Sequence, residues 1–465
     1  MAKETHLAAR RLAITGGRVI DPAQGIDKVA DVLIKDGVIE GVVDPSSGRF
    51  FDGYDVIDAS GMIVSPGFVD LHTHLRDPGQ EWKETIISGT RAAAHGGFTT
   101  VCAMPNTDPV QDSAAVVEDV MRRAAADGMV RVLPIGAISV GQHGKQLAPM
   151  GELADAGVIG FSDDGNPVAD ANLMRQALAY SIEVGLPIIN HAEDKSLVNG
   201  GVMSAGTVAT RLGLAGVPAE TETAMVARDL HLAELTKARL HIPHISTAGS
   251  IIALRAAKER GVNVTAEVTP HHLMLNDKWV YGLHGDVPDQ VGSQSYDTNT
   301  KVNPPLRSHE DAEAVIAALD EGLIDIIATD HAPHALTDKI CTYNEAAHGI
   351  NVLETALSMV FDLVTSDRIS LTRIIESLTS GPAAILGKDL GSLKKGFSAD
   401  VAIIDPEAQW VVEPEQFASK SVNTPLNGVK LTGRVVQTIY QGETVFDLST
   451  QSASTGAAVD LGARA

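Results

Sequence analysis

Two histidines one residue apart, His72 and His74, directly follow the apolar run GFVDL and precede an Arg-Asp-Pro-Gly sequence. On a β-strand, side chains two residues apart point to the same side, so both imidazoles can reach one point. A metal ion is the simplest partner that two such rings could share. Many histidines only satisfy hydrogen bonds, so the pair becomes a strong signal only if other ligands join it.

Four more side chains of metal-binding type stand at the ends of other apolar runs, namely Asp164, His191, His244 and Asp330. An ionised aspartate at the end of an apolar strand is costly unless it is paired or bound to a metal. Six such groups outnumber the ligands that one tetrahedral zinc ion requires, whereas two ions sharing a bridging carboxylate would use all of them. The sequence therefore favours a two-metal site.

The elements that must position these side chains recur along the middle of the chain. Eight short apolar runs end in polar clusters: GFVDLHTH (67–74), FTTVCAMPN (98–106), VRVLPIGAIS (130–139), VIGFSDDG (158–165), LPIINHAE (186–193), RLHIPHIS (239–246), NVTAEVTPHH (263–272) and DIIATDHAPH (325–334). Segments between them, such as 112–128 and 170–185, carry apolar residues at helical spacing. This alternation predicts an α/β protein with a (β/α)8 barrel, the TIM-barrel class. In a parallel barrel the carboxyl ends of all strands face one mouth, where the six groups would meet.

The two flanks of the chain have a different pattern. Residues 12–64 and 397–447 contain short alternating strands interrupted by Gly and Asp, and neither flank is long enough for a comfortable sheet alone. We therefore predict one small β-sandwich domain built from both chain termini. The predicted division is 1–64 and 388–450 for this β domain, 65–387 for the metal-dependent barrel, and 451–465 for a flexible tail of small and polar residues.

Composition excludes several classes of protein. The chain has 465 residues, 44% hydrophobic and 20% charged, and no apolar run approaches the roughly 20 residues of a membrane helix. A net charge of −23 argues against nucleic acid or an anionic membrane as partner. The start of the chain lacks the apolar region of a signal peptide, so we expect a cytoplasmic protein. The two cysteines, Cys102 and Cys341, form no metal-ribbon motif and are predicted to be buried small residues.

Several motifs in the same order resemble a known family. They are GFVDLHTHLRDPGQEWKETI, MPNT, GFSDDG, NHAED, HISTAGS, KVNPPLR and ATDHAPH. Together they resemble the amidohydrolase superfamily and, within it, the class I bacterial dihydroorotases, over essentially the whole chain. The resemblance implies two Zn2+ ions per chain. One would be held by His72, His74 and Asp330 and the other by His191 and His244, with Asp164 as the bridge.

The activity implied by the resemblance is the reversible, zinc-dependent cyclisation of N-carbamoyl-L-aspartate to dihydroorotate, a step of de novo pyrimidine biosynthesis. Asp330 would be the catalytic proton carrier. The implied substrate contacts are His74, Arg76, Asn106, Asn303, His334, His348 and Gly349. The guanidinium of Arg76 could present a fork to a planar carboxylate. Around His348 the sequence HGINVLET departs from the family pattern, which puts a role for that side chain in doubt but not one for the backbone.

Two other functions stay open at this point. One is another cyclic amidohydrolase of the hydantoinase or allantoinase type, although the segment FSDDG lacks the lysine with which such relatives bridge their metals. The other is an inactive scaffold for aspartate transcarbamoylase, although all six ligand positions carry competent side chains. An active enzyme could also bind that transcarbamoylase or form a homodimer, and the sequence does not decide either point.

Overall fold

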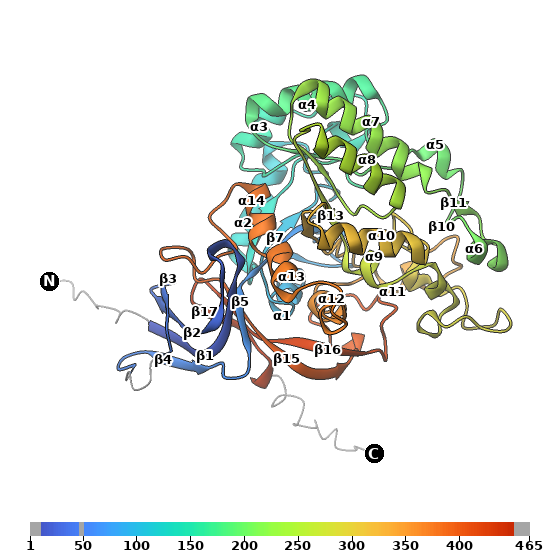
Figure 1. The fold of residues 1–465 in the computed structure, drawn as a ribbon. Coiled ribbons are helices and arrows are strands. Elements are labelled where there is room, and N and C mark those ends of the chain that lie inside the picture. The colour runs from blue at the N-terminus through green and yellow to red at the C-terminus, as the bar shows by residue number, and fades with distance from the viewer. Residues whose placement is uncertain (1–10, 46–50, 451–465) are drawn as a thin grey trace, which may run out of the picture.

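The computed structural model describes residues 11–45 and 51–450, and these form a helix-covered barrel with a β-sheet along one side (Figure 1). The sheet is made from both ends of the described chain, as its blue and red strands show. The predicted flexible tail, 451–465, lies outside the described residues.

Eight parallel positions around the ring, called staves below, close the barrel; seven are strands and one is a single bridging residue. Three form one sheet, β6 (Phe68–Thr73), β7 (Phe98–Ala103) and β8 (Arg131–Pro134), and four form another, β9 (Ile188–Ile189), β12 (Leu240–Ile242), β13 (Val264–Val268) and β14 (Ile326–Ile327). The fourth stave is reduced to Phe161, which bridges Gly136 on one side and Ile188 on the other. A parallel bridge between Thr73 and His331 closes the ring. The predicted (β/α)8 barrel is confirmed.

Burial on both faces explains why the staves read as continuous apolar runs. All six residues of β6 and of β7 are buried. Val69 and Leu71 belong to one apolar cluster with Cys102 and Ile189, whereas Phe68 belongs to the larger cluster that includes helical side chains. The alternation along β6 therefore separates the barrel interior from the layer between strands and helices.

Helices cover the outside of the barrel and its ends. They are α1 (Ile86–His95), α2 (Ala114–Asp127), α3 (Met150–Asp155), α4 (Ala171–Val184), α5 (Lys195–Val198), α6 (Thr207–Leu212), α7 (Glu220–Thr236), α8 (Ala248–Glu259), α9 (Pro270–Met274), α10 (His309–Asp320), α11 (Leu336–Lys339), α12 (Ala356–Thr365), α13 (Leu371–Leu378) and α14 (Ser380–Leu386). The helices expected within 112–128 and 170–185 are present as α2 and α4. Asp170 caps α4 by accepting from two backbone N–H groups, and Gly185 ends it at a φ of 72°.

In the part of the chain that the structure describes, the sheet beside the barrel has eight strands. They are β1 (Arg11–Asp21), β2 (Ile26–Lys35), β3 (Val38–Val43), β4 (Asp55–Asp58), β5 (Ile63–Pro66), β15 (Val401–Val411), β16 (Lys430–Tyr440) and β17 (Glu443–Asp447). β5 joins the two halves, pairing in parallel with β1 and antiparallel with β15. Only Gly67 separates β5 from β6. The small β domain predicted from both termini is confirmed, while the residue boundaries at 64 and 387 stay predictions.

Strand β15 ties the sheet to the barrel through its alternation. Val401 and Ile403 pack in the core of the β domain, whereas Ala402 and Ile404 pack in the large barrel cluster. Arg131 of β8 adds an ion pair of 2.8 Å to Asp400, just before β15. The sheet and the barrel therefore share a continuous apolar contact.

Two expectations from composition can be compared with the structure. Cys102 is buried, as predicted, but Cys341 is exposed, because it follows the short helix α11 on the surface, so that prediction was wrong. Within residues 11–45 and 51–450, no helix is both long enough and apolar enough to cross a membrane.

The two short strands β10 (Met203–Ser204) and β11 (Gly216–Val217) form a separate pair.

Candidate metal centre and substrate pocket

The six side chains singled out as ligands lie together at the carboxyl ends of the staves. His72 is on β6 and His74 just after it, and the other four follow the fourth stave, β9, β12 and β14, namely Asp164, His191, His244 and Asp330. All six are buried. The closed parallel barrel explains the gathering, because it brings residues from distant parts of the sequence to one mouth.

The first group surrounds the histidine pair. His74 Nε2 lies 3.0 Å from Asp330 Oδ1 and 3.5 Å from Asp164 Oδ2. His72 Nε2 lies 3.4 Å from Asp330 Oδ1 and 3.6 Å from Asp164 Oδ1. The ligand atoms of His72, His74 and Asp164 all lie within 4.8 Å of one another.

The second group contains the same aspartate. Asp164 Oδ1 lies 3.3 Å from His191 Nδ1 and 3.6 Å from His244 Nε2, and the two histidine nitrogens are 2.9 Å apart. The ligand atoms of these three residues also lie within 4.8 Å of one another. Because Asp164 belongs to both groups, its carboxylate stands where one ligand could reach two cations.

The electrostatics of the cluster favour cations. Two buried atoms at its centre, His72 Nε2 and Asp164 Oδ1, have no hydrogen-bond partner among the described residues. Burial lowers the pKa of His72, but the carboxylates of Asp330 and Asp164 outweigh it and raise that pKa well above its usual value. The same carboxylate charge that favours a proton on this buried imidazole also favours a metal cation beside it.

The backbone at the mouth is held in an uncommon conformation. Arg76, His244 and Asp330 have φ values of 62°, 34° and 46°, in the left-handed region that non-glycine residues seldom adopt. Such conformations persist only where the surrounding structure over-determines them. Three of the predicted site residues share this conformation. At the mouth, the surrounding structure therefore sets the directions of these side chains although the local backbone conformation is unfavourable.

Sequence reasoning missed the carboxylate behind His72. Glu267, on β13, places Oε1 2.7 Å from His72 Nδ1 and Oε2 2.9 Å from His241 Nε2. Its side chain is 1% exposed, and the adjacent imidazoles hold its pKa below the usual value although burial acts in the opposite direction. A carboxylate that receives Nδ1–H leaves Nε2 free to bind metal. The available signal was an acidic residue inside the buried run NVTAEV.

Asp163, the neighbour of Asp164, faces away from the cluster. Its carboxylate accepts hydrogen bonds from the backbone N–H groups of Ile138 and Ser139, at 2.8 and 3.0 Å, and from the Ser139 hydroxyl. Of the two aspartates in FSDDG, only Asp164 therefore reaches the histidines.

A pocket of about 360 Å3 opens above the cluster. Its lining includes all seven residues predicted to contact substrate, namely His74, Arg76, Asn106, Asn303, His334, His348 and Gly349. Asn106 Oδ1 accepts from His74 Nδ1 at 3.0 Å, and the Asn303 side-chain amide donates to His191 Nε2 at 3.3 Å. The pocket and the cluster are thus one continuous site.

Arg76 supplies the positive charge of the pocket. Its Nε donates to the carbonyl of Pro333 at 3.2 Å, and one terminal nitrogen lies 3.4 Å from His334 Nε2. Burial lowers the pKa of Arg76 to about 10, so the guanidinium stays charged at neutral pH. Burial and the charge of Arg76 also lower the pKa of His334, to about 2, so His334 is neutral. An anionic group of a ligand would meet one fixed cation and one neutral imidazole.

Loops held by residues outside the barrel motifs complete the wall. Asn423, from the C-terminal flank, donates to the carbonyls of Ala332 and Gly349 and accepts from the N–H of His334. Gly349 has a φ of 147°, and a Cβ there would lie 2.6 Å from the Ala332 oxygen, so only glycine fits. The backbone N–H of Gly349 already donates to the carbonyl of Lys301. The preceding residue, His348, is exposed. No periodic pattern in the sequence signals the role of Asn423.

Comparison with known proteins decides the family. A dihydroorotase of Anaeromyxobacter dehalogenans is 51% identical over 440 residues, which cover 94% of this chain and 98% of that protein. The chain belongs to the dihydroorotase family. Residues 61–250 match the sequence family described as Dihydro-orotase-like, and a dihydroorotase of Geobacter metallireducens is 48% identical over 94% of this chain and 99% of its own length.

Solved structures extend the likeness to neighbouring families. An L-hydantoinase of Arthrobacter aurescens superposes with a TM-score of 0.81 at 26% identity, over 94% of this chain and 96% of that protein. A dihydropyrimidinase of Brevibacillus agri reaches a TM-score of 0.80 at 22% identity, over 94% and 95%, and this likeness concerns the fold alone. Among these relatives, the dihydroorotase family is the one supported by high sequence identity.

Proposed function

We propose that this chain catalyses the reversible hydrolysis of the cyclic amide of dihydroorotate to N-carbamoyl-L-aspartate, with ring closure as the biosynthetic direction. The observation that carries the proposal is the pair of ligand groups that share Asp164, directly below a pocket with a single charged arginine. The family membership supports the same reaction.

The residues of the cluster fit two zinc ions. His72, His74 and Asp330 would hold one ion, His191 and His244 the other, and Asp164 would bridge them. The two unpartnered buried atoms, His72 Nε2 and Asp164 Oδ1, support this assignment, since buried polar atoms rarely go without a partner. Nitrogen and carboxylate donors are the ligands that zinc prefers. When bound, such ions supply a nucleophilic water at neutral pH and polarise the amide carbonyl.

Asp330 is proposed as the proton carrier. Burial alone would raise its pKa, but the imidazoles of His72 and His74 hold that pKa below its usual value, so the carboxylate is ionised and able to accept a proton. Its Oδ1 lies at the floor of the pocket, within 3.0 Å of His74 Nε2. Asp330 would take the proton of the attacking water and deliver it to the departing ring nitrogen, and reverse the transfer during ring closure.

Arg76 is proposed to hold the substrate carboxylate. Its Nε is fixed on Pro333, so its terminal nitrogens are the ones left to face the pocket, where a planar carboxylate could accept from them. Asn106, Asn303 and His334 would orient the rest of the ring from the other walls. A clamp of this kind positions the amide carbonyl over the cluster and accounts for a substrate that carries a carboxylate beside its cyclic amide.

Hydrolysis of hydantoins is the second candidate, because the solved structures that superpose well on this chain include hydantoinases. The aspartate at position 164, where the hydantoinase type is expected to use lysine, counts against it. Association with aspartate transcarbamoylase, a homodimer and a cytoplasmic location stay predictions from the sequence.

Metal analysis combined with a substrate panel tests the proposal. We expect two zinc ions per chain, hydrolysis of dihydroorotate and cyclisation of N-carbamoyl-aspartate. An active enzyme that contains no metal would refute the zinc assignment. Hydrolysis of hydantoins without any turnover of dihydroorotate would replace the proposed reaction with the second candidate.

A further inference from the structure

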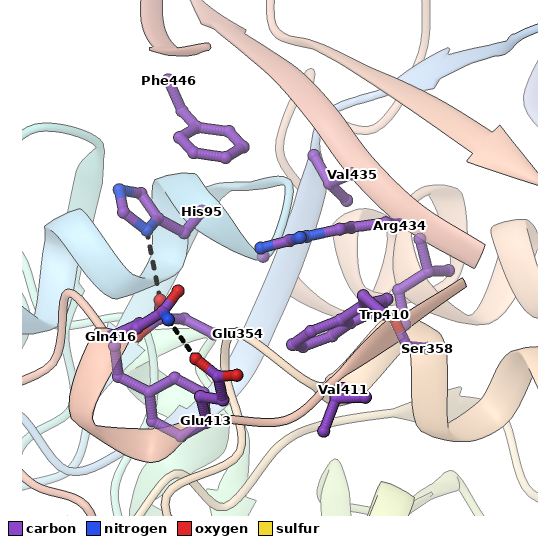
Figure 2. Close-up of a pocket in the computed structure, with 13 residues that line it drawn as sticks. His95, Glu354, Ser358, Trp410, Val411, Glu413, Gln416, Arg434, Val435 and Phe446 are labelled. Atoms are coloured by element: carbon purple, nitrogen blue, oxygen red, sulfur yellow. Dashed lines mark hydrogen bonds and ion pairs between the residues drawn. The ribbon is translucent and has the colours of Figure 1, made fainter. Parts of the chain in front are cut away.

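A second cavity lies where the barrel meets the sheet, and it shares no lining residue with the substrate pocket. Its volume is about 390 Å3. The walls come from the end of α1, the start of α12, strands β15 to β17 and the short turn Pro414–Gln416 (Figure 2). Nothing in the proposed reaction uses this cavity.

Arg434 is the distinctive side chain of the cavity. Its guanidinium carbon lies 4.5 Å from the centre of the Trp410 ring. Figure 2 shows the guanidinium extending over this ring into the cavity, toward His95. Among the described residues it makes no hydrogen bond or ion pair, so its N–H groups are available. By contrast, Arg131 stacks on Tyr440 but is also paired with Asp400.

The carboxylates of the cavity are engaged elsewhere. Glu354 accepts from the backbone N–H groups of Ala418 and Ser419, each at 3.1 Å, and lies 3.1 Å from His95 Nδ1. Glu413 accepts from the side-chain amide of Gln416. Burial lowers the pKa of Arg434 and the nearby charge of Glu354 acts against that change, but no carboxylate within residues 11–45 and 51–450 forms an ion pair with the guanidinium.

The remaining walls are preformed and partly apolar. The Trp410 Nε1–H donates to the Ser358 hydroxyl at 3.2 Å, and Ser358 in turn donates to the carbonyl of Gly433, which fixes the plane of the indole. The apolar side chains in the lining of the cavity include Leu357, Val411, Val435 and Phe446. A cation held on an aromatic face beside apolar walls is a ready-made partner for an anion with an apolar body.

We propose that this cavity binds a small organic anion, with its carboxylate or phosphate on the guanidinium of Arg434 and its apolar part against Leu357, Val435 and Phe446. The volume suits such a ligand, since small-molecule sites range from roughly 300 to 1,000 Å3. The planar fork of arginine matches both kinds of oxyanion, so the ligand's head group is a matter for experiment.

Calorimetric titration of the full-length, metal-loaded protein tests the proposal with three probes: benzoate, phenyl phosphate and inorganic phosphate. Because Arg76 could also attract these anions, the titrations include Arg76→Gln, which removes the cation of the substrate pocket. Arg434→Gln removes the proposed contact and Arg434→Lys keeps the charge without the fork. Arg18→Gln is the matched control, since Arg18 lies on β1 and pairs with Asp27 outside the cavity.

We expect one equivalent of benzoate or phenyl phosphate to bind with a dissociation constant of about 1 mM or tighter. Binding should persist in Arg76→Gln and Arg18→Gln, weaken roughly ten- to hundredfold in Arg434→Gln, and weaken less in Arg434→Lys. Benzoate alone would identify a carboxylate ligand, and phenyl phosphate alone a phosphate ligand. Inorganic phosphate binding as tightly as phenyl phosphate would refute the apolar part of the proposal.

A measurement on the unaltered sequence covers the case in which the Arg434 variants fail to fold. The chain has three tryptophans, and in protein labelled with 5-fluorotryptophan we expect one fluorine resonance, that of Trp410, to shift as the probe is added. No binding of any probe, no movement of a tryptophan resonance, or binding that disappears only in Arg76→Gln would each overturn the proposal.

Discussion

Replacing Glu267 by glutamine tests how far the metal centre depends on the carboxylate behind it. The substitution keeps the size of the side chain and removes one negative charge between His72 and His241, whose nitrogens lie 2.7 and 2.9 Å from its oxygens. Glutamine offers one acceptor and one donor, so it can serve His72 if the amide faces His241. His241 can adapt, because its other nitrogen lies 2.8 Å from a Thr265 hydroxyl that is free to rotate.

The magnitude follows from the two hydrogen bonds. A hydrogen bond to a charged acceptor contributes about 1 kcal/mol more than one between neutral groups. Losing the charge at both contacts therefore weakens the interaction of residue 267 with the two imidazoles by about 2 kcal/mol. This agrees with the ten- to hundredfold loss of metal affinity that is typical when a partner of a ligating histidine is altered. We therefore expect zinc affinity to fall by roughly that factor, and dihydroorotate turnover at limiting zinc to fall with it.

Competition with a chromophoric chelator measures the affinity. Asp21→Asn is the matched control, because Asp21 is also fully buried and accepts three hydrogen bonds, from Gln24, Ser392 and Leu393, but lies in the sheet. The control should lower thermal stability and leave zinc affinity unchanged. Zinc affinity within twofold of the wild type in Glu267→Gln would refute the inference that Glu267 tunes His72.

Further predictions concern the reaction, the clamp, the loop and the metal. Asp330→Asn should keep part of the metal and lower kcat by about a hundredfold or more, and normal turnover would rule out its role as proton carrier. Arg76→Lys should lower kcat/KM by about ten- to hundredfold, mainly through KM, and an unchanged specificity constant would refute the clamp. Asn423→Ala should destabilise the fold by about 2 kcal/mol in denaturant titrations and raise KM, because three buried backbone groups lose their partner. Chelation should lower the melting temperature and abolish activity, and added zinc should restore both, whereas a melting curve unaffected by chelation would contradict the two-metal centre.

The mouth of the barrel was accessible to prediction because its chemistry follows the strand pattern. Each ligand stands at the end of an apolar run, and parallel closure brings such ends together whatever the details of pairing. Asp163 and Asp164 both follow the same apolar run, so the strand pattern alone does not tell which of them reaches the histidines. Only the structure shows Asp163 bonded to the backbone of Ser139.

The supporting residues could not be found in the same way. Asn423 lies in an irregular segment whose position over the mouth depends on the path of the chain between β15 and β16, and no local pattern encodes that path. Likewise, in the fourth apolar run only Phe161 forms parallel bridges to the neighbouring staves. Strand pairing depends on the two adjacent segments as well as on the run itself, so the run alone does not predict it. Whether the Arg434 guanidinium has N–H groups left to bind a ligand depends on the side chains around it, and the sequence does not reveal which side chains these are.

The order in which the strands of the sheet are synthesised has a consequence for expression. β1 to β5 leave the ribosome before any barrel strand, but β15, which pairs with β5, is made after the last one. Until then β5 presents unpaired N–H and C=O groups along the edge that β15 will occupy. The first barrel strand, β6, begins only two residues after β5 ends and therefore follows an incomplete sheet. A chain ended before residue 401 would therefore aggregate rather than yield a smaller active barrel.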